Sequence, residues 1–272
     1  MRGVRAFFIN LADAAERRAA LVWGFAAHRC ASWELARVEA VTAAEAEAAA
    51  VPGRISWREK ACFLSHRRAV ETSLAEDGPS WIMEDDVAFG AHSFPLVEHG
   101  IGARKGADWD ILFTDFGVGH TGQMLRFMDM GQRLHAARKA VAMDLRRVHF
   151  TGAMSYIVAA EAKPKLHALL AEAEVLDQAY DTFLRMAVRS GRLRAVGLFP
   201  FATTFHSLAM QSQVRDASDS EADSLIRAFR RALWFERDLN ASLPELEARI
   251  GDNPEARAYG ALLGALLFAR GK

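Results

Sequence analysis

Residues 81–86 read Trp-Ile-Met-Glu-Asp-Asp, and this stretch decides the fold that the sequence predicts. Apolar residues that stop abruptly at charged ones are typical of a buried strand that ends at the edge of a sheet. Because successive side chains of a strand alternate between its faces, Glu84 and Asp86 are expected to point one way and Asp85 the other. The stretch therefore predicts a strand whose end places the carboxylates of Glu84 and Asp86 on the same side of the sheet.

Three neighbouring carboxylates repel one another, so this cluster costs free energy unless a cation lies close to it. Carboxylate oxygens are hard ligands that suit Mg²⁺ or Mn²⁺. A solvated acidic turn is the alternative, and the apolar strand before the triplet favours the metal site. An acid-x-acid pair of this kind is an arrangement in which a divalent ion can bridge a protein and a diphosphate.

The composition is that of an ordinary globular protein, with 51% hydrophobic and 25% charged residues in a chain of 272. Lys and Arg together number 34, as do Asp and Glu, so the formal net charge is zero. A dedicated nucleic-acid-binding protein would show a basic excess, and we therefore expect no nucleic-acid partner. Basic pairs such as Arg104-Lys105 and Arg146-Arg147 leave local contact with an acidic membrane surface open.

The two cysteines, Cys30 and Cys62, lack the spacing of a structural zinc site. Their apolar neighbours predict reduced core thiols, and a single disulfide between them is the alternative.

The apolar run at residues 6–9 is too short for a signal peptide and is better interpreted as a first strand. No apolar run approaches the roughly 20 residues that a membrane-spanning helix needs. We expect a cytoplasmic protein, with peripheral contact to the inner membrane face left open.

Strand-like and helix-like segments alternate along the first part of the chain, which predicts an α/β domain over residues 1–215. Asp13 is the expected N-cap of the first helix, and capping boxes are expected at Thr42 with Glu45 and at Ser56 with Glu59. A helical C-terminal extension is expected over residues 216–272, with helices at 221–239, 244–250 and 254–270. The expected strands lie at 4–9, 33–38, 81–83, 110–114, 155–159 and 194–199, and the other helices at 13–27, 42–50, 57–75, 161–174 and 180–190.

Two segments in the middle of the chain are harder to assign. The glycine-rich stretch 117–122 could approach a phosphate, but nothing after it completes a phosphate-binding loop, so a mobile surface loop is preferred. Residues 123–147 are expected to form either an acceptor-side loop or an antiparallel hairpin.

Four separated segments carry a resemblance to a known family. They are residues 9–11 (Ile-Asn-Leu) with 16–18 (Glu-Arg-Arg), 59–66 (Glu-Lys-Ala-Cys-Phe-Leu-Ser-His), 83–87 (Met-Glu-Asp-Asp-Val) and 151–158 (Thr-Gly-Ala-Met-Ser-Tyr-Ile-Val), followed by Asp177 and Asp181. In this order, over roughly residues 4–215, they resemble glycosyltransferase family 25, which includes bacterial lipooligosaccharide galactosyltransferases and collagen galactosyltransferases. Two positions depart from the family pattern: Ala61 replaces a glycine, and Ala12-Asp13 stand where the family is often more basic.

The resemblance implies a GT-A type fold, a nucleotide-diphospho-sugar donor and inversion at the transferred sugar. UDP-galactose is the donor it suggests, and a cell-surface glycan such as a lipopolysaccharide core is the acceptor. The charge of the leaving diphosphate must be neutralised, which Mn²⁺ or Mg²⁺ does as a Lewis acid. Asp86 is the first expected metal ligand, Glu84 lies at the metal or contacts the donor ribose, and Asp85 is the reserve ligand.

Inversion also needs a base that takes the proton from the attacking hydroxyl, and a carboxylate is the usual candidate. Asp181 is the preferred base, and Asp177, one helical turn earlier, is expected to face the same cleft. The alternative is that these two aspartates are an N-cap and a first-turn acid. His66 is expected to hydrogen-bond to the donor phosphate or to the acceptor, and a purely structural histidine is its alternative.

Further donor-binding residues are expected near the ends of strands and helices. Asn10 ends the first strand, where open α/β sheets bind ligands, and suits a nucleotide base or ribose. Arg17 could pair with the diphosphate, since its planar fork matches phosphate oxygens. The other candidates are Leu11, Glu59, Asp85 and Gly152 for the donor, with His206 near the metal or diphosphate.

The C-terminal segment alternates arginines, among them Arg227, Arg230, Arg231 and Arg237, with apolar residues. This predicts an amphipathic helix that either packs on the domain or docks at a membrane carrying lipid-linked acceptors. The apolar tail 261–268 is expected to pack on the core or to pair in a homodimer, and resting on lipid is the less favoured alternative. Two alternatives to an active transferase stay open: a non-catalytic nucleotide-sugar-binding homologue, and a Mg²⁺-dependent phosphoester hydrolase that uses the acid cluster.

Overall fold

The computed structural model describes residues 4–103, 108–206 and 229–237. Several expectations lie outside these residues: the pair Arg104-Lys105, Arg227, most of the helix expected at 221–239, the helices at 244–250 and 254–270, and the apolar tail.

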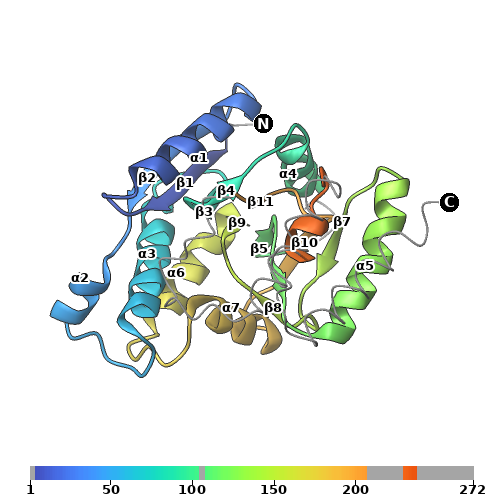
Figure 1. The fold of residues 1–272 in the computed structure, drawn as a ribbon. Helices are drawn as coiled ribbons and strands as arrows, with labels where there is room; N and C mark the ends of the chain where they lie inside the picture. Colours follow the sequence, from blue (N-terminus) through green and yellow to red (C-terminus); the bar gives the residue numbers. More distant parts are fainter. Residues whose placement is uncertain (1–3, 104–107, 207–228, 238–272) are drawn as a thin grey trace, which may run out of the picture.

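A seven-stranded sheet forms the centre of the protein, in the order β2-β1-β3-β9-β5-β10-β7 (Figure 1). Strands β2, β1, β3, β5 and β10 run in one direction, whereas β9 and β7 are antiparallel to their neighbours. The architecture is a mixed, Rossmann-like α/β fold, which confirms the predicted α/β class. The strands are β1 (Arg5–Asn10), β2 (Glu34–Glu39), β3 (Ser80–Glu84), β5 (Ile111–Phe113), β7 (Val141–Asp144), β9 (Ser155–Val158) and β10 (Ala195–Phe199).

Helices cover both faces of this sheet (Figure 1). One face carries α1 (Ala15–His28) and α4 (Ser93–Gly102), and the other carries α3 (Trp57–Ser73), α6 (Lys163–Ala171) and α7 (Tyr180–Arg189). The remaining elements are α2 (Ala43–Ala48), α5 (Thr121–Ala136) beside β7, the 3-10 helix η2 (Ala160–Ala162), and two short ladders, β4 (Val87–Ala88) with β11 (Thr204–Phe205) and β6 (Gly117–Val118) with β8 (Phe150–Thr151).

The alternation of side chains along β3 decides which face each residue serves. The Trp81 ring packs edge-on against Phe94 of α4, on the face of α1 and α4. Ile82 and Glu84 therefore point to the opposite face, where α3 lies. Tyr156 of β9 stands opposite Ile82 in the register, and its hydroxyl contacts His66 of α3 on that same face. The end of β3 thus delivers Glu84 to α3.

Several element boundaries differ from those expected. Helix α1 begins at Ala15, two residues after Asp13, with Ala14 at the N-cap position and no side-chain cap, so the expected Asp13 cap is wrong. Both capping boxes, at Thr42 and at Ser56, are confirmed. Residues 123–147 form neither a loop nor a hairpin: most belong to α5, and β7 pairs antiparallel with β10. The glycine-rich stretch 117–122 contains β6 and the first two residues of α5.

The order of the strands creates a crevice beside β1. This strand has β2 on one side and β3 on the other. The chain leaves β1 through α1 on one face and reaches β3 through α3 on the opposite face. Such a topological switch point opens a crevice beyond the carboxyl ends of the strands. Asn10, the residues after β2 and the triplet Glu84–Asp86 therefore gather at one edge of the sheet.

The described C-terminal residues, 229–237, pack on the α/β body. Phe229 and Leu233 are buried, and the backbone of Phe201 exchanges hydrogen bonds with Leu233 and Phe235. The Glu236 carboxylate accepts a hydrogen bond of 2.9 Å from the backbone N–H of Ala91. This part of the expected extension is therefore held to the domain by backbone pairing as well as by apolar contact. Within the described residues, no helix has both the length and the apolar character needed to cross a membrane.

Candidate functional site

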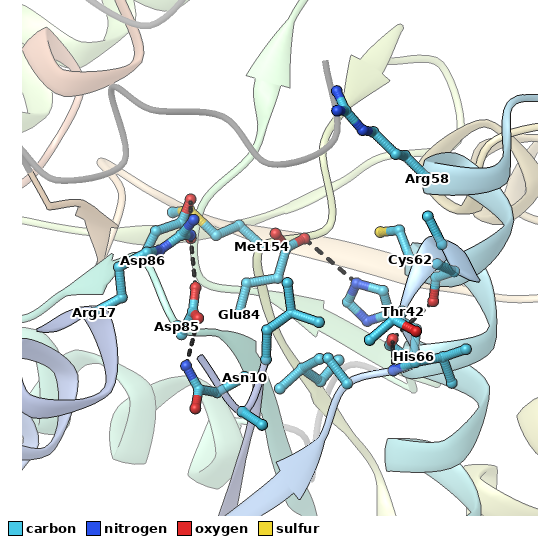
Figure 2. A pocket seen from close by; sticks show the side chains of 18 of the residues that line it. Asn10, Arg17, Thr42, Arg58, Cys62, His66, Glu84, Asp85, Asp86 and Met154 are labelled. Atoms are coloured by element: carbon cyan, nitrogen blue, oxygen red, sulfur yellow. Dashed lines mark hydrogen bonds and ion pairs between the residues drawn. The ribbon is translucent and has the colours of Figure 1, made fainter. Parts of the chain in front are cut away.

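A cavity of about 520 Å³ lies at the crevice beside β1 (Figure 2). Its volume falls within the range of roughly 300–1,000 Å³ that is usual for small-molecule sites. The ends of β1 and β3, the residues that follow β2, one side of α3 and the C-terminal segment all contribute to its wall. Seven of the predicted site residues line it: Asn10, Leu11, Arg17, His66, Glu84, Asp85 and Asp86.

The acidic triplet divides between the two helices that flank the crevice. Glu84, the last residue of β3, faces α3, while Asp85 and Asp86 both face Arg17 of α1 (Figure 2). Arg17 Nη2 lies 2.6 Å from Asp85 Oδ1 and 3.4 Å from Asp86 Oδ2. The expected pairing of Glu84 with Asp86 is therefore wrong, because β3 ends at Glu84 and the next two residues form a turn that leaves the strand alternation.

Asp86 has the ligand atom that a cation would need. Its Oδ1 is buried and has no hydrogen-bond partner among the described residues. Burial and the negative charge of Glu84 raise the pKa of Asp86 to about 7, although the Arg17 guanidinium opposes the shift. A buried carboxylate whose pKa stays this high has too little positive charge around it to balance its own charge and that of Glu84. The residues present therefore fit a bound divalent ion with Asp86 as a ligand.

Asp85 is held by neighbouring side chains instead. Its Oδ2 accepts a hydrogen bond of 2.7 Å from Asn10 Nδ2, and its Oδ1 pairs with Arg17. Burial raises the pKa of Asp85, while Arg17 and Asn10 oppose the shift. The Asn10 amide also donates to the Ala14 carbonyl and accepts from Arg37 Nε. Asn10 thus lines the cavity, but its polar atoms position Asp85.

The α3 side of the cavity holds Cys62, His66 and Glu84 close together (Figure 2). His66 Nε2 lies 3.4 Å from Glu84 Oε1, and His66 Nδ1 lies 3.1 Å from the Tyr156 hydroxyl. Burial raises the pKa of Glu84, but the hydrogen bond and charge of His66 outweigh it, so the net shift is downward. Burial and the charges of Glu84, Asp181 and Asp86 raise the pKa of Cys62 well above its usual value. Cys62 is therefore a protonated thiol, which does not suit a nucleophile.

Two arginines that sequence reasoning did not select also line the cavity, Arg58 and Arg230. Arg230 pairs with Asp115, which is fully buried, through Nε at 3.1 Å from Oδ2 and through a second contact from Nη2 to Oδ1. Burial raises the pKa of Asp115, and the charge of Arg230 opposes the shift. The spacing of Arg58 could have revealed it, since it lies four residues before Cys62 on α3. No local pattern distinguishes Arg230 from the other arginines around it.

Asp181 and Gly152 contact each other outside the set of residues that line the cavity. Asp181 Oδ2 accepts a hydrogen bond of 2.7 Å from Gly152 N–H, and its Oδ1 accepts one from Thr182 N–H. Gly152 has φ +74°, a conformation that favours glycine. A Cβ added there would lie 3.4 Å from Arg230 Nη1, so this pair lies close to the arginine that does line the cavity.

Asp177 and Glu59 are placed elsewhere. Helix α7 begins at Tyr180, so Asp177 precedes it and shares no helical turn with Asp181. Asp177 accepts a hydrogen bond of 2.9 Å from Arg54 N–H and lines a separate cavity of about 390 Å³. Hydrogen bonds from Arg54 lower the pKa of Asp177.

Glu59 closes the capping box with Ser56 and does not line the main cavity. His206 meets Asp86 through its backbone, whose N–H donates to the Asp86 carbonyl at 2.6 Å.

Comparisons with models of protein families and with curated proteins find no match to this chain.

Proposed function

We propose that this protein is a metal-dependent, inverting glycosyltransferase of the GT-A type that uses a nucleotide-sugar donor. The observation that carries the proposal is the buried, unpartnered Oδ1 of Asp86 in a cavity that also contains Arg17 and Arg230. A carboxylate poised for a cation and two guanidiniums suit a diphosphate that must leave with its charge neutralised. The resemblance of four sequence segments to glycosyltransferase family 25 points to the same chemistry.

Several side chains at the cavity have a role in this proposal. Asp86 would hold Mn²⁺ or Mg²⁺, which when bound supplies a Lewis acid for the leaving diphosphate. Arg17 and Arg230, which both line the cavity, would bind phosphate oxygens of the donor. Asp85 fixes Arg17, and Asn10 fixes Asp85. The donor thus meets groups that are already held in place, which lowers the cost of ordering them on binding.

The family resemblance also supplies the proposed substrates. We propose UDP-galactose as the donor, and as the acceptor a cell-surface glycan such as a lipopolysaccharide core, free or linked to lipid. The exposed pair Arg146-Arg147 suits peripheral contact with an acidic membrane that carries such an acceptor.

A thermal-unfolding panel of nucleotide sugars, each with and without Mn²⁺, tests the proposal. A UDP-sugar should raise the melting temperature only when Mn²⁺ is present, by roughly 5 °C or more at one hundred times its Kd. Asp86→Asn should abolish the shift because it removes the ligand charge. Asp177→Asn is the matched control, since it makes the same change at a carboxylate outside the cavity, and should keep the shift.

Other outcomes of this panel, or of assays for sugar transfer and phosphate release, would replace the proposal. Equal stabilisation by every nucleotide without metal contradicts the Asp86 site. Donor binding without transfer to any glycan acceptor identifies a binding module, and release of phosphate without an acceptor identifies a hydrolase.

The base of the proposed transfer is tested separately with Asp181→Asn. If Asp181 takes the proton of the acceptor hydroxyl, kcat should fall at least about a hundredfold while donor affinity is kept. If its carboxylate serves only the backbone of Gly152 and Thr182, the variant should lose stability while kcat changes little.

A further inference from the structure

We propose that Cys62, His66 and Glu84 form a second metal centre, which binds Zn²⁺ and is distinct from the site of the hard ion at Asp86. One ligand atom from each residue, the thiol sulfur, an imidazole nitrogen and a carboxylate oxygen, lies within 4.8 Å of the other two. A tetrahedral zinc ion places its ligands about 2.0–2.3 Å from itself, so three atoms this close can share one ion after small rotations of the side chains.

The chemistry of the three ligands selects the ion. Sulfur and imidazole nitrogen are borderline or soft ligands that favour Zn²⁺, whereas Mg²⁺ and Mn²⁺ favour sites made of oxygen. Asp85 and Asp86 offer oxygen alone on the α1 side of the cavity, and Cys62 with His66 offers sulfur and nitrogen on the α3 side (Figure 2). The cavity therefore has two groups of ligands that prefer different metals.

The surroundings of His66 are those of a histidine ligand. Its Nε2 faces Glu84, and its Nδ1 is 3.1 Å from the Tyr156 hydroxyl, which in turn lies 2.7 Å from the Tyr180 hydroxyl. The His66 ring also stacks on Tyr180, with centroids 4.1 Å apart and planes 4° from parallel. A ring nitrogen held by a hydrogen bond on the side away from the metal is the usual arrangement around bound zinc, because it fixes the tautomer and the ring orientation.

The position of the cluster on α3 leaves a coordination site for a ligand. Cys62 and His66 are four residues apart, so they lie on one side of the helix, and both line the cavity with Glu84. Three protein ligands leave one tetrahedral position, which is the composition of zinc sites that bind an exchangeable water or substrate oxygen.

Cobalt titration of the full-length protein tests this inference. Co²⁺ replaces Zn²⁺ in tetrahedral sites, and a bound thiolate gives a charge-transfer absorption band in the near ultraviolet. After treatment with a chelator, one equivalent of Co²⁺ should produce this band, and one equivalent of Zn²⁺ should remove it. Cys62→Ser should abolish the band, whereas Cys30→Ser, the same change at the other cysteine of the chain, should leave it intact. Tyr156→Phe should weaken zinc binding about 10–100-fold, because the ring of His66 loses its orienting hydroxyl.

A measurement on the unaltered protein covers the case in which Cys62→Ser fails to fold. Zn²⁺ should slow the alkylation of Cys62 at least tenfold and leave the alkylation of Cys30 unchanged, as read by mass spectrometry of the two cysteine peptides. Equal alkylation of Cys62 with and without Zn²⁺, or a cobalt band that survives in folded Cys62→Ser, overturns the inference. The cobalt band should persist in Asp86→Asn, which loses the Mn²⁺-dependent donor shift, so this centre and the proposed transferase can fail independently.

Discussion

Asp86 is a residue at which folding and the proposed function make opposite demands. Its pKa is raised from the ordinary aspartate value to about 7 by burial and by Glu84. The folded protein therefore keeps a proton that the unfolded chain loses near pH 4, so this residue contributes stability below that pH. The contribution is lost as the pH rises toward 7, where the folded protein must hold the carboxylate charged. The same charge is what a divalent ion requires.

Because the pKa of Asp86 is shifted upward, the stability of the protein should fall as the pH rises. In the presence of a chelator, the free energy of unfolding of the wild type, measured in urea, should fall between pH 5 and pH 8 by up to a few kcal/mol relative to Asp86→Asn. Asparagine cannot titrate, so the variant lacks this part of the pH dependence. Saturating Mn²⁺ at pH 8 should restore the wild type and leave the variant unchanged. Parallel pH profiles for the two proteins would show that Asp86 is ionised throughout the range.

At the scale of elements, helix α3 carries Arg58, Cys62 and His66 into the cavity, and its start is fixed by a capping box. Glu59 N–H donates to Ser56 Oγ at 3.3 Å, and Ser56 N–H donates to Glu59 Oε2 at 2.9 Å. These bonds satisfy backbone groups that would otherwise lack partners at the helix N-terminus. Glu59 therefore has a structural role that is independent of any donor.

Ser56→Ala should lower the free energy of unfolding by about 1 kcal/mol, because the N-cap acceptor is lost. Glu59→Gln should cost less, since glutamine can still accept the hydrogen bond from Ser56. Urea denaturation measures both, and the metal-dependent shift with a UDP-sugar should be kept in each variant. If Glu59→Gln instead loses donor binding at unchanged stability, Glu59 contacts the donor as the sequence suggested.

The elements that sequence predicted well are those whose signals are local. The capping boxes and the apolar strands depend on neighbours within a few residues. Helix α5 was missed because Gly122 and Gly131 lower its intrinsic helix propensity. Tertiary packing favours a glycine at position 131, because a Cβ there would lie 3.3 Å from the Leu233 side chain and 3.4 Å from the Phe199 ring. Such a reason cannot be read from the helix itself.

At the scale of the whole molecule, the strand order brings the predicted residues together, and the sequence does not state that order. Asn10 and the acidic triplet were found because they lie at the ends of strands on the same edge, and Arg17 was found because its planar guanidinium suits phosphate oxygens. Asp177 was misplaced because its spacing from Asp181 matches a helical turn that α7 does not include. Arg230 was missed because its partner, Asp115, is 115 residues away. The alternation of strands and helices predicts the fold class, but long-range pairs depend on packing.

The pair of Arg230 and Asp115 links the C-terminal segment to the cavity, and this link can be tested. Asp115 is fully buried, so Arg230→Met would leave a carboxylate in the interior without its cation. Breaking a buried ion pair from one side typically costs about 3–5 kcal/mol. We expect a loss of this size in urea denaturation, together with weaker binding of the UDP-sugar, since Arg230 also lines the cavity. Arg231→Met makes the same change of charge one residue away and should cost less.

The double variant Arg230→Met with Asp115→Asn separates the two contributions of Arg230. Removing the stranded charge should recover part of the lost stability, because a neutral amide is cheaper to bury than an unpaired carboxylate. Donor binding should stay weak, since the amide replaces none of the positive charge that the diphosphate needs. If the double variant is no more stable than Arg230→Met alone, the buried charge of Asp115 is not what Arg230 offsets, and the C-terminal segment is held by its apolar contacts and backbone pairing.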